Sequence, residues 1–211
     1  MDDRSRSTRA WEGWSIVGAV AIALILVVTI EAMTASAPVE GIRGIIRATA
    51  RTSFALFSLA FTASAARHFW PNAWTRWQLR NRRYLGVSFA VSHFVHLLAI
   101  LALGRIAPAE LAAHADSVTW IFGGIAYVFI ALMTATSFDA TARLIGRRAW
   151  TTLHTVGSYY IWFIFANSYL SRAAIIPAYI PAAALIVFTL GLRIAARVSR
   201  ARARSRAVAS S

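Results

Sequence analysis

The sequence predicts an all-α membrane protein, a bundle of six transmembrane helices with both termini in the cytoplasm. Three observations lead to this prediction. Hydrophobic residues make up 58% of the 211 residues, and the mean hydropathy of +0.58 lies above the range of soluble domains. Six apolar stretches each come close to the ~20 residues that cross a bilayer. Arginine is concentrated at alternate ends of these stretches.

The apolar stretches define the expected helices in order. The first, Trp14–Met33, has the length of a complete span. The second, Thr52–Ala66, is shorter, and we expect the turns before it to complete the crossing. The other four are Tyr84–Gly104, Val118–Ser137, Thr151–Leu170 and Ile176–Leu192.

Only short connections remain between these stretches, so the sequence predicts one membrane domain. We assign it to residues 14–195. Residues 1–13 are expected to form a cytoplasmic N-terminal segment, and residues 196–211 an arginine-rich cytoplasmic tail.

The basic residues indicate the orientation. All 22 are arginine, and most precede the first stretch, separate the second from the third or the fourth from the fifth, or close the chain. The other connections contain only Arg43, Arg47, Arg51, Arg105 and Arg172. The positive-inside rule then predicts a multi-pass protein with both termini in the cytoplasm. A net charge of +14 also suits nucleic acid. The arginines flank spans, however, so we expect membrane lipids and no nucleic acid as their partner.

Several classes of redox protein are excluded by composition. The chain has no cysteine, which removes cysteine-ligated iron–sulfur clusters, thioether-linked haem and disulfides. No glycine-rich phosphate loop follows a strand, so we expect no nicotinamide or flavin domain.

Histidines within apolar stretches are the candidate functional residues. An imidazole in hydrocarbon is costly, and its usual role there is to bind a metal or haem iron, or to carry protons. His93 and His96 lie in the third stretch, with His96 ~18 Å along a helix that starts at Tyr84. Asn167 reaches a similar depth in the fifth stretch. His154 and His68 are expected near the cytoplasmic side, ~13–20 Å from that level.

Three segments of the sequence resemble a known family. They are Arg82–Gly86 (RRYLG) followed by His96, Leu144–His154 (LIGRRAWTTLH), and Thr49–Thr52 (TART). Together they resemble the ferric-reductase-like transmembrane domain family. Within it the chain is most similar to the haem-binding membrane subunit of the bacterial periplasmic methionine sulfoxide reductase system. The resemblance covers roughly residues 45–170.

This resemblance implies a haem b membrane subunit that carries electrons across the inner membrane to a periplasmic redox enzyme. It implies His96 and His154 as ligands of one or two haems. Because no flavin or nicotinamide domain is expected, electrons would come from a separate donor, either a flavin, a quinone or a cytoplasmic reductase. Such a chain would be the electron-transfer subunit of an oxidoreductase.

One departure from the family pattern affects the outer haem. The family has a further histidine at the position of Asn167, and an amide is a poor ligand for haem iron. His93, His68 or a partner protein would then supply the missing ligand, or the outer site lacks haem. Thirteen residues also set His154 and Asn167 ~140° apart on an ideal helix. A bulge near Gly157-Ser158 would be needed to turn both to one cavity.

Two further alternatives remain open. Arg51 would either face a haem propionate or extend to the membrane interface. The whole bundle would alternatively be a non-redox membrane protein, an assembly partner or a small permease, that kept the fold and lost haem.

Overall fold

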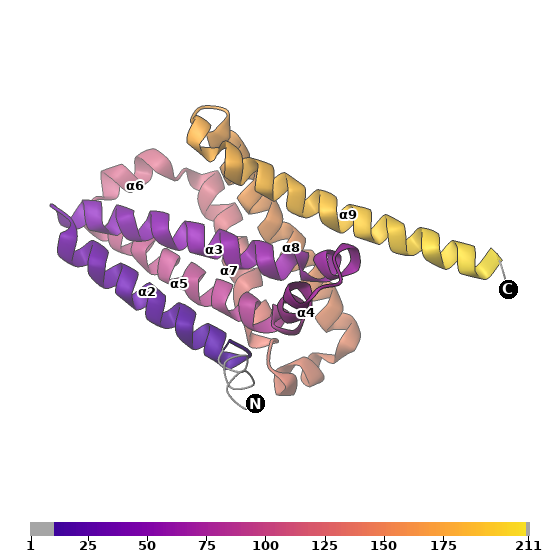
Figure 1. Cartoon of the computed structure of the whole chain (residues 1–211). Helices are drawn as coiled ribbons and strands as arrows, with labels where there is room; N and C mark the ends of the chain where they lie inside the picture. The colour runs from indigo at the N-terminus through magenta and orange to yellow at the C-terminus, as the bar shows by residue number, and fades with distance from the viewer. Residues whose placement is uncertain (1–10, 210–211) are drawn as a thin grey trace.

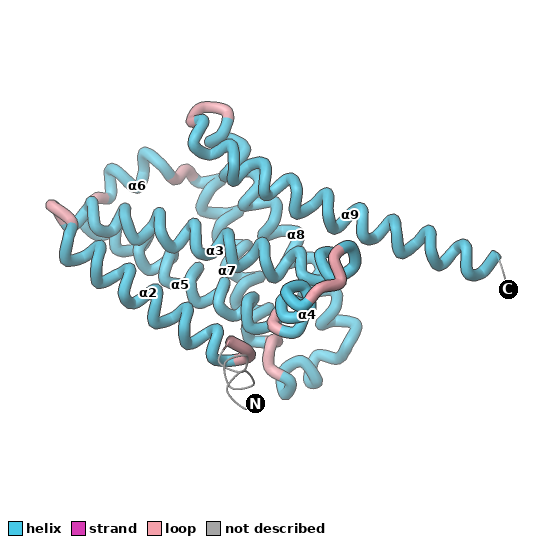
Figure 2. The backbone as a smooth tube through the Cα atoms, viewed as in Figure 1, coloured by secondary structure: helices cyan, strands magenta, loops and turns pink. Residues whose placement is uncertain are grey.

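Helices account for nearly all of the described chain. In a computed structural model the structure describes residues 11–209, which form eight α-helices, one short 3-10 helix and no strand (Figures 1 and 2). In order they are α2 (Trp14–Thr34), α3 (Pro38–Phe69), α4 (Ala73–Arg80), α5 (Arg82–Ile106), α6 (Pro108–His114), α7 (Ser117–Ala135), α8 (Asp139–Ala173), η1 (Pro177–Tyr179) and α9 (Ile180–Ala209).

The central helix of the bundle is α3. It packs most extensively against α5, and it also contacts α2, α4 and α9. Its buried residues include Phe54, Phe57 and Phe61. The ring of Phe165 from α8 inserts beside them, with its centre 5.3 Å from that of Phe57 and 6.2 Å from that of Phe89 on α5. The core is thus a cluster of aromatic rings between α3, α5 and α8.

Buried hydroxyl groups also join α3 to α5. The Ser53 hydroxyl donates to the Ser92 hydroxyl at 2.9 Å, and the Ser92 hydroxyl donates to the carbonyl of Thr49 at 3.2 Å. Both serines are fully buried. Small side chains let the two helix backbones approach, and the hydrogen bonds satisfy polar groups that apolar surroundings would leave without partners.

Local signals in the sequence explain several helix ends. Pro38 occupies the first turn of α3, where its missing N–H costs nothing. Asn72 caps α4 by accepting from the Thr75 amide at 2.9 Å. Asp116 caps α7 in the same way through the Thr119 amide at 2.8 Å.

Among residues 11–209, four helices are long and apolar enough to cross a membrane, which indicates a multi-pass membrane protein. They are α2, α5, α7 and the segment Pro177–Val208, which comprises η1 and nearly all of α9. The expected stretches Thr52–Ala66 and Thr151–Leu170 also lie in helices, α3 and α8. These two helices carry arginines and hydroxyl residues, which lower their hydropathy.

Two helix boundaries differ from the expected ones. The predicted tail is not a separate segment within the described residues, because α9 continues unbroken to Ala209. In Figure 1 its last turns extend beyond the other helices. The bend in α8 lies at Gly146, with φ 75° and ψ 159°, and not at Gly157-Ser158. A Cβ at Gly157 would come within 2.5 Å of Met133 Sδ, so this glycine allows α8 to approach α7.

Candidate functional site around the intramembrane histidines

His96 is held on α5 by two oxygen atoms of α3. Its Nδ1 lies 3.1 Å from the carbonyl oxygen of Ile46 and 3.1 Å from Thr49 Oγ1. A carbonyl can only accept, and the Thr49 hydroxyl donates its own proton to the carbonyl of Ile45 at 2.6 Å. We therefore assign the imidazole proton to Nδ1. Nε2 then keeps a lone pair, and no described residue donates a hydrogen bond to it.

His93 lies one turn before His96, and other rings surround it. Its ring is stacked on His96 at 5.3 Å and on Tyr127 of α7 at 5.0 Å, and the edge of Phe165 is 5.9 Å away. Its Nδ1 is buried without a hydrogen-bond partner. The Tyr127 hydroxyl donates to the main-chain carbonyl of His93, at 3.2 Å, and not to the ring.

His154 packs on the C-terminal end of α7. Its Nε2 is 3.0 Å from Thr136 Oγ1, and that hydroxyl donates to the carbonyl of Leu132 at 2.7 Å. The proton of His154 therefore sits on Nε2, and Nδ1 is the open nitrogen. Trp150 stacks on the imidazole at 4.2 Å and donates from Nε1 to the carbonyl of Thr136 at 3.0 Å.

His68 and Arg51 are exposed and lie apart from this arrangement. The Nε2 of His68 is 3.1 Å from Ser199 Oγ on α9. Arg51 is close enough to Tyr169 to interact with it electrostatically, and Arg172 interacts in the same way with Tyr169 and His96. Both arginines thus carry positive charge near Tyr169, and Arg172 also carries it near His96.

Asn167 does not face His96. It is exposed, while its neighbours Phe165 and Ala166 are buried. The straight course of α8 past Gly157 keeps His154 and Asn167 on different faces, as their spacing on an ideal helix requires. Asn167 therefore does not lie in a buried cavity with His96.

Some residues that orient the histidines were not among the sequence candidates. Thr49 belongs to the TART segment of the sequence, and its position beside His96 requires the pairing of α3 with α5. Thr136 carries no local signal at all. The structure separates the predicted histidines. His93 lies beside His96, His154 lies alone, and His68 lies against α9.

The residues present fit a haem iron with one imidazole ligand and do not fit one with two. Metal-bound histidines generally donate one ring nitrogen to a backbone carbonyl and use the other as ligand, and His96 has that arrangement. His154 offers only Nδ1, because Thr136 occupies Nε2. No cluster of three or more His, Asp or Glu residues suited to a metal ion occurs in the described chain.

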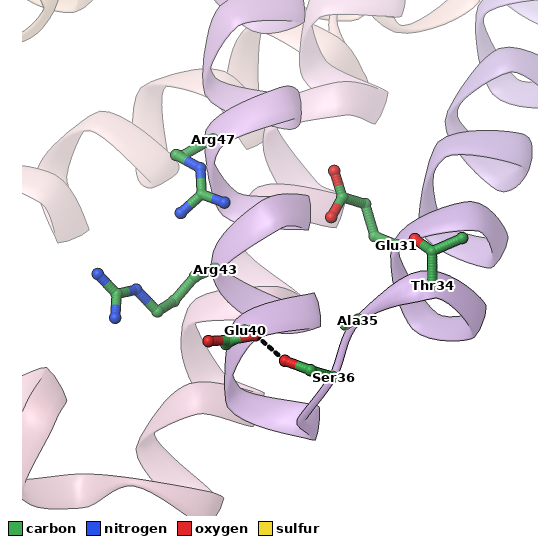
Figure 3. Close-up of a pocket in the computed structure, with 7 residues that line it drawn as sticks. All are labelled: Glu31, Thr34, Ala35, Ser36, Glu40, Arg43 and Arg47. Atoms are coloured by element: carbon green, nitrogen blue, oxygen red, sulfur yellow. Dashed lines mark hydrogen bonds between the residues drawn. The ribbon is translucent and has the colours of Figure 1, made fainter.

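A separate polar pocket of about 540 Å³ opens at the turn between α2 and α3. Figure 3 shows Glu31 pointing from α2 toward α3, while Arg43 and Arg47 project from the other side of α3, and it shows a hydrogen bond from Ser36 to Glu40. None of the histidines lines this pocket.

Comparison with known proteins adds no assignment. No family model, curated protein or solved structure matches the chain.

Proposed function

We propose that the chain is a multi-pass protein of a bacterial inner membrane with six spans and both termini in the cytoplasm. The spans would be α2, α3, α5, α7, α8 after its bend at Gly146, and α9. Consecutive helices run in opposite directions, and the arginine-rich connections are those at α4 and at the start of α8. In Figure 1, α4 and the end of α9 lie toward one end of the bundle, opposite the α2–α3 turn and α6.

Within this membrane bundle, we propose that His96 binds a b-type haem and that the chain carries electrons across the membrane. The observation that supports this most directly is the open Nε2 of His96, held in place by Nδ1 hydrogen bonding to α3. A bound haem supplies one-electron exchange. The chain supplies the ligand, a ring-lined environment of low dielectric, and the nearby guanidinium groups of Arg51 and Arg172.

In this proposal electrons enter on the cytoplasmic side near His154 and leave near His96. A separate donor is required, either a flavin, a quinol or a cytoplasmic reductase, because the sequence has no nucleotide-binding motif. The proposed acceptor is a periplasmic redox enzyme.

Two structural observations favour the second candidate, a non-redox bundle that serves as an assembly partner or small permease. Aromatic side chains fill the interior between α5 and α8, where Phe165 contacts Phe57, Phe89 and His93. The position that would supply a second imidazole holds an exposed asparagine. These two features are the ones expected of a bundle that folds without a prosthetic group.

Haem content after reconstitution distinguishes the two candidates. We expect the purified wild-type protein to bind b-type haem and His96→Ala to lose most of it. His68→Ala is the matched control, since it removes an exposed histidine and should keep wild-type content. Absence of haem from wild-type protein saturated with haem would support the non-redox bundle, as would equal content in all three proteins.

A further inference from the structure

Two arginines of α9 are fixed against the last turns of α3. The Cζ atom of Arg193 lies 4.1 Å from the centre of the Phe61 ring and 4.9 Å from that of Tyr159 on α8. Its Nη1 donates to the carbonyl of Phe61 at 3.2 Å. Two turns later, Arg200 Nη2 donates to the carbonyl of Ser64 at 2.6 Å. These contacts hold both guanidinium groups in defined positions.

No carboxylate compensates these charges within residues 11–209. A third guanidinium, that of Arg82 at the start of α5, is close enough to Arg193 to interact with it, as is Arg200. The ion pairs of the described chain lie elsewhere: Arg43 with Glu110, Arg80 with Glu12, and Arg83 with Asp139. Arg193 and Arg200, both held against α3, therefore form a cluster of like charge, and an anion bound between them would relieve their repulsion.

The surroundings of this cluster indicate which anion. Arg193 is half-buried between aromatic rings. Leu185, Val187 and Phe188, which precede it on α9, are apolar and exposed. A ligand that fits both features has a phosphate at the arginines and hydrocarbon chains along the outer face of α9.

We propose that Arg193 and Arg200 bind the phosphate of an anionic phospholipid in the cytoplasmic leaflet. Basic pockets between transmembrane helices on this side are suited to such headgroups, and arginine forms charge-assisted hydrogen bonds with phosphate. The site rests on the membrane orientation proposed above and is independent of haem.

Native mass spectrometry of the detergent-purified full chain tests the site with two lipids of identical acyl chains. The wild-type protein should retain phosphatidylglycerol in preference to phosphatidylcholine. The double variant Arg193→Gln/Arg200→Gln should bind phosphatidylglycerol about thirtyfold more weakly, because it loses two arginines that attract the anionic headgroup. The control variant Arg204→Gln/Arg206→Gln removes the same amount of charge from α9, at positions after the part of the helix that contacts α3. It should keep the wild-type affinity for phosphatidylglycerol.

A further variant keeps the test valid if the double variant does not fold. Arg200→Gln alone leaves the ring contacts of Arg193 intact and should still weaken phosphatidylglycerol binding several-fold. An equal loss in the Arg204/Arg206 control would overturn the proposal, and so would equal retention of the two lipids by the wild type.

Inorganic phosphate tests the source of the headgroup. We expect it to leave the unfolding temperature of the wild-type protein unchanged at low millimolar concentration. Stabilisation by inorganic phosphate that requires Arg193 and Arg200, without a preference between the lipids, would reject the lipid and indicate a soluble phosphate. Haem content can be measured in the same preparations, so failure of the haem proposal and failure of this site are distinguishable.

Discussion

At the scale of single residues, a threonine sets the proton position in each of two histidines. The hydroxyls of Thr49 and Thr136 donate to carbonyls of their own helices, so each accepts from an imidazole N–H. The open nitrogen is consequently Nε2 in His96 and Nδ1 in His154. This difference makes His96 the better candidate for an iron ligand.

Substitution of Asn167 by histidine tests its orientation. Because residue 167 is exposed and lies on a different face of α8 from His154, Asn167→His should leave the coordination state of any haem unchanged. The visible spectra of variant and wild type, recorded in the oxidised and reduced forms, measure this. A new six-coordinate spectrum in the variant would show that residue 167 reaches the iron.

The residue scale is also where sequence reasoning fell short. The sequence identified His93, His96 and His154 because apolar runs of that length rarely contain imidazoles. It could not show which oxygen atom each ring meets, because Ile46 and Thr49 meet His96 only when α3 pairs with α5. The orientation of Asn167 depends on whether α8 bends at Gly157. The helix does not bend there, because the glycine instead allows α8 to pack closely against α7.

At the scale of helices, the close approach of α2 and α3 depends on Gly41. A Cβ at this position would lie 2.9 Å from the carbonyl oxygen of Glu31 and 3.1 Å from Ala35 Cβ. Gly41→Ala should therefore destabilise the protein by about 1–3 kcal/mol, as overpacking does. Thermal unfolding followed by tryptophan fluorescence measures the change.

Gly18 of α2 provides the control for Gly41. Nothing lies within 4 Å of a Cβ built at Gly18, so Gly18→Ala should be neutral or raise the unfolding temperature through helix propensity. Equal destabilisation by both substitutions would contradict the packing assigned to Gly41.

Asp116 should make the first turn of α7 sensitive to pH. Hydrogen bonds from the hydroxyl and the amide of Thr119 lower the pKa of this carboxyl. The ionised carboxylate of Asp116 therefore stabilises α7 fully when the pH is above the ordinary carboxyl pKa. This stabilisation is lost as the pH falls through the lowered pKa of Asp116. The protection of the first-turn amides of α7, measured relative to the intrinsic exchange rate at each pH, should fall in that acidic range in the wild-type protein. Asp116→Ala should show low protection at every pH, and the same pH dependence of protection in this variant would exclude Asp116 as the cause.

Helix positions were predictable from apolar periodicity and composition, but helix lengths were not. Four of the expected stretches lie entirely within α2, α3, α5 and α8, because a run of apolar residues must hydrogen-bond its own backbone in hydrocarbon. Val118–Ser137 extends two residues past the end of α7, and Ile176–Leu192 begins before η1 and α9. The extensions of α3 back to Pro38 and of α9 to Ala209 involve arginine-rich turns. Arginine is a good helix former, so a charged segment can continue an apolar helix without any signal in hydropathy.

At the scale of the whole molecule, the orientation can be tested by cysteine labelling, since the chain has no native cysteine. Ser205→Cys on the exposed end of α9 should react with an impermeant maleimide only after the membrane is opened. Ala113→Cys on α6 should react in intact cells whose outer membrane has been permeabilised. The reverse pattern would invert the proposed orientation and move the arginine cluster to the outer leaflet.

The central claim is that a haem iron is bound by one imidazole, that of His96. A ferrous haem with a single protein ligand has an open coordination position and takes up carbon monoxide. We therefore predict that carbon monoxide shifts the Soret band of the dithionite-reduced, haem-loaded protein. The His96→Ala protein, prepared in the same way, should bind little haem. A reduced spectrum that carbon monoxide does not change would contradict single ligation, and a wild-type protein without a Soret band would contradict haem binding itself.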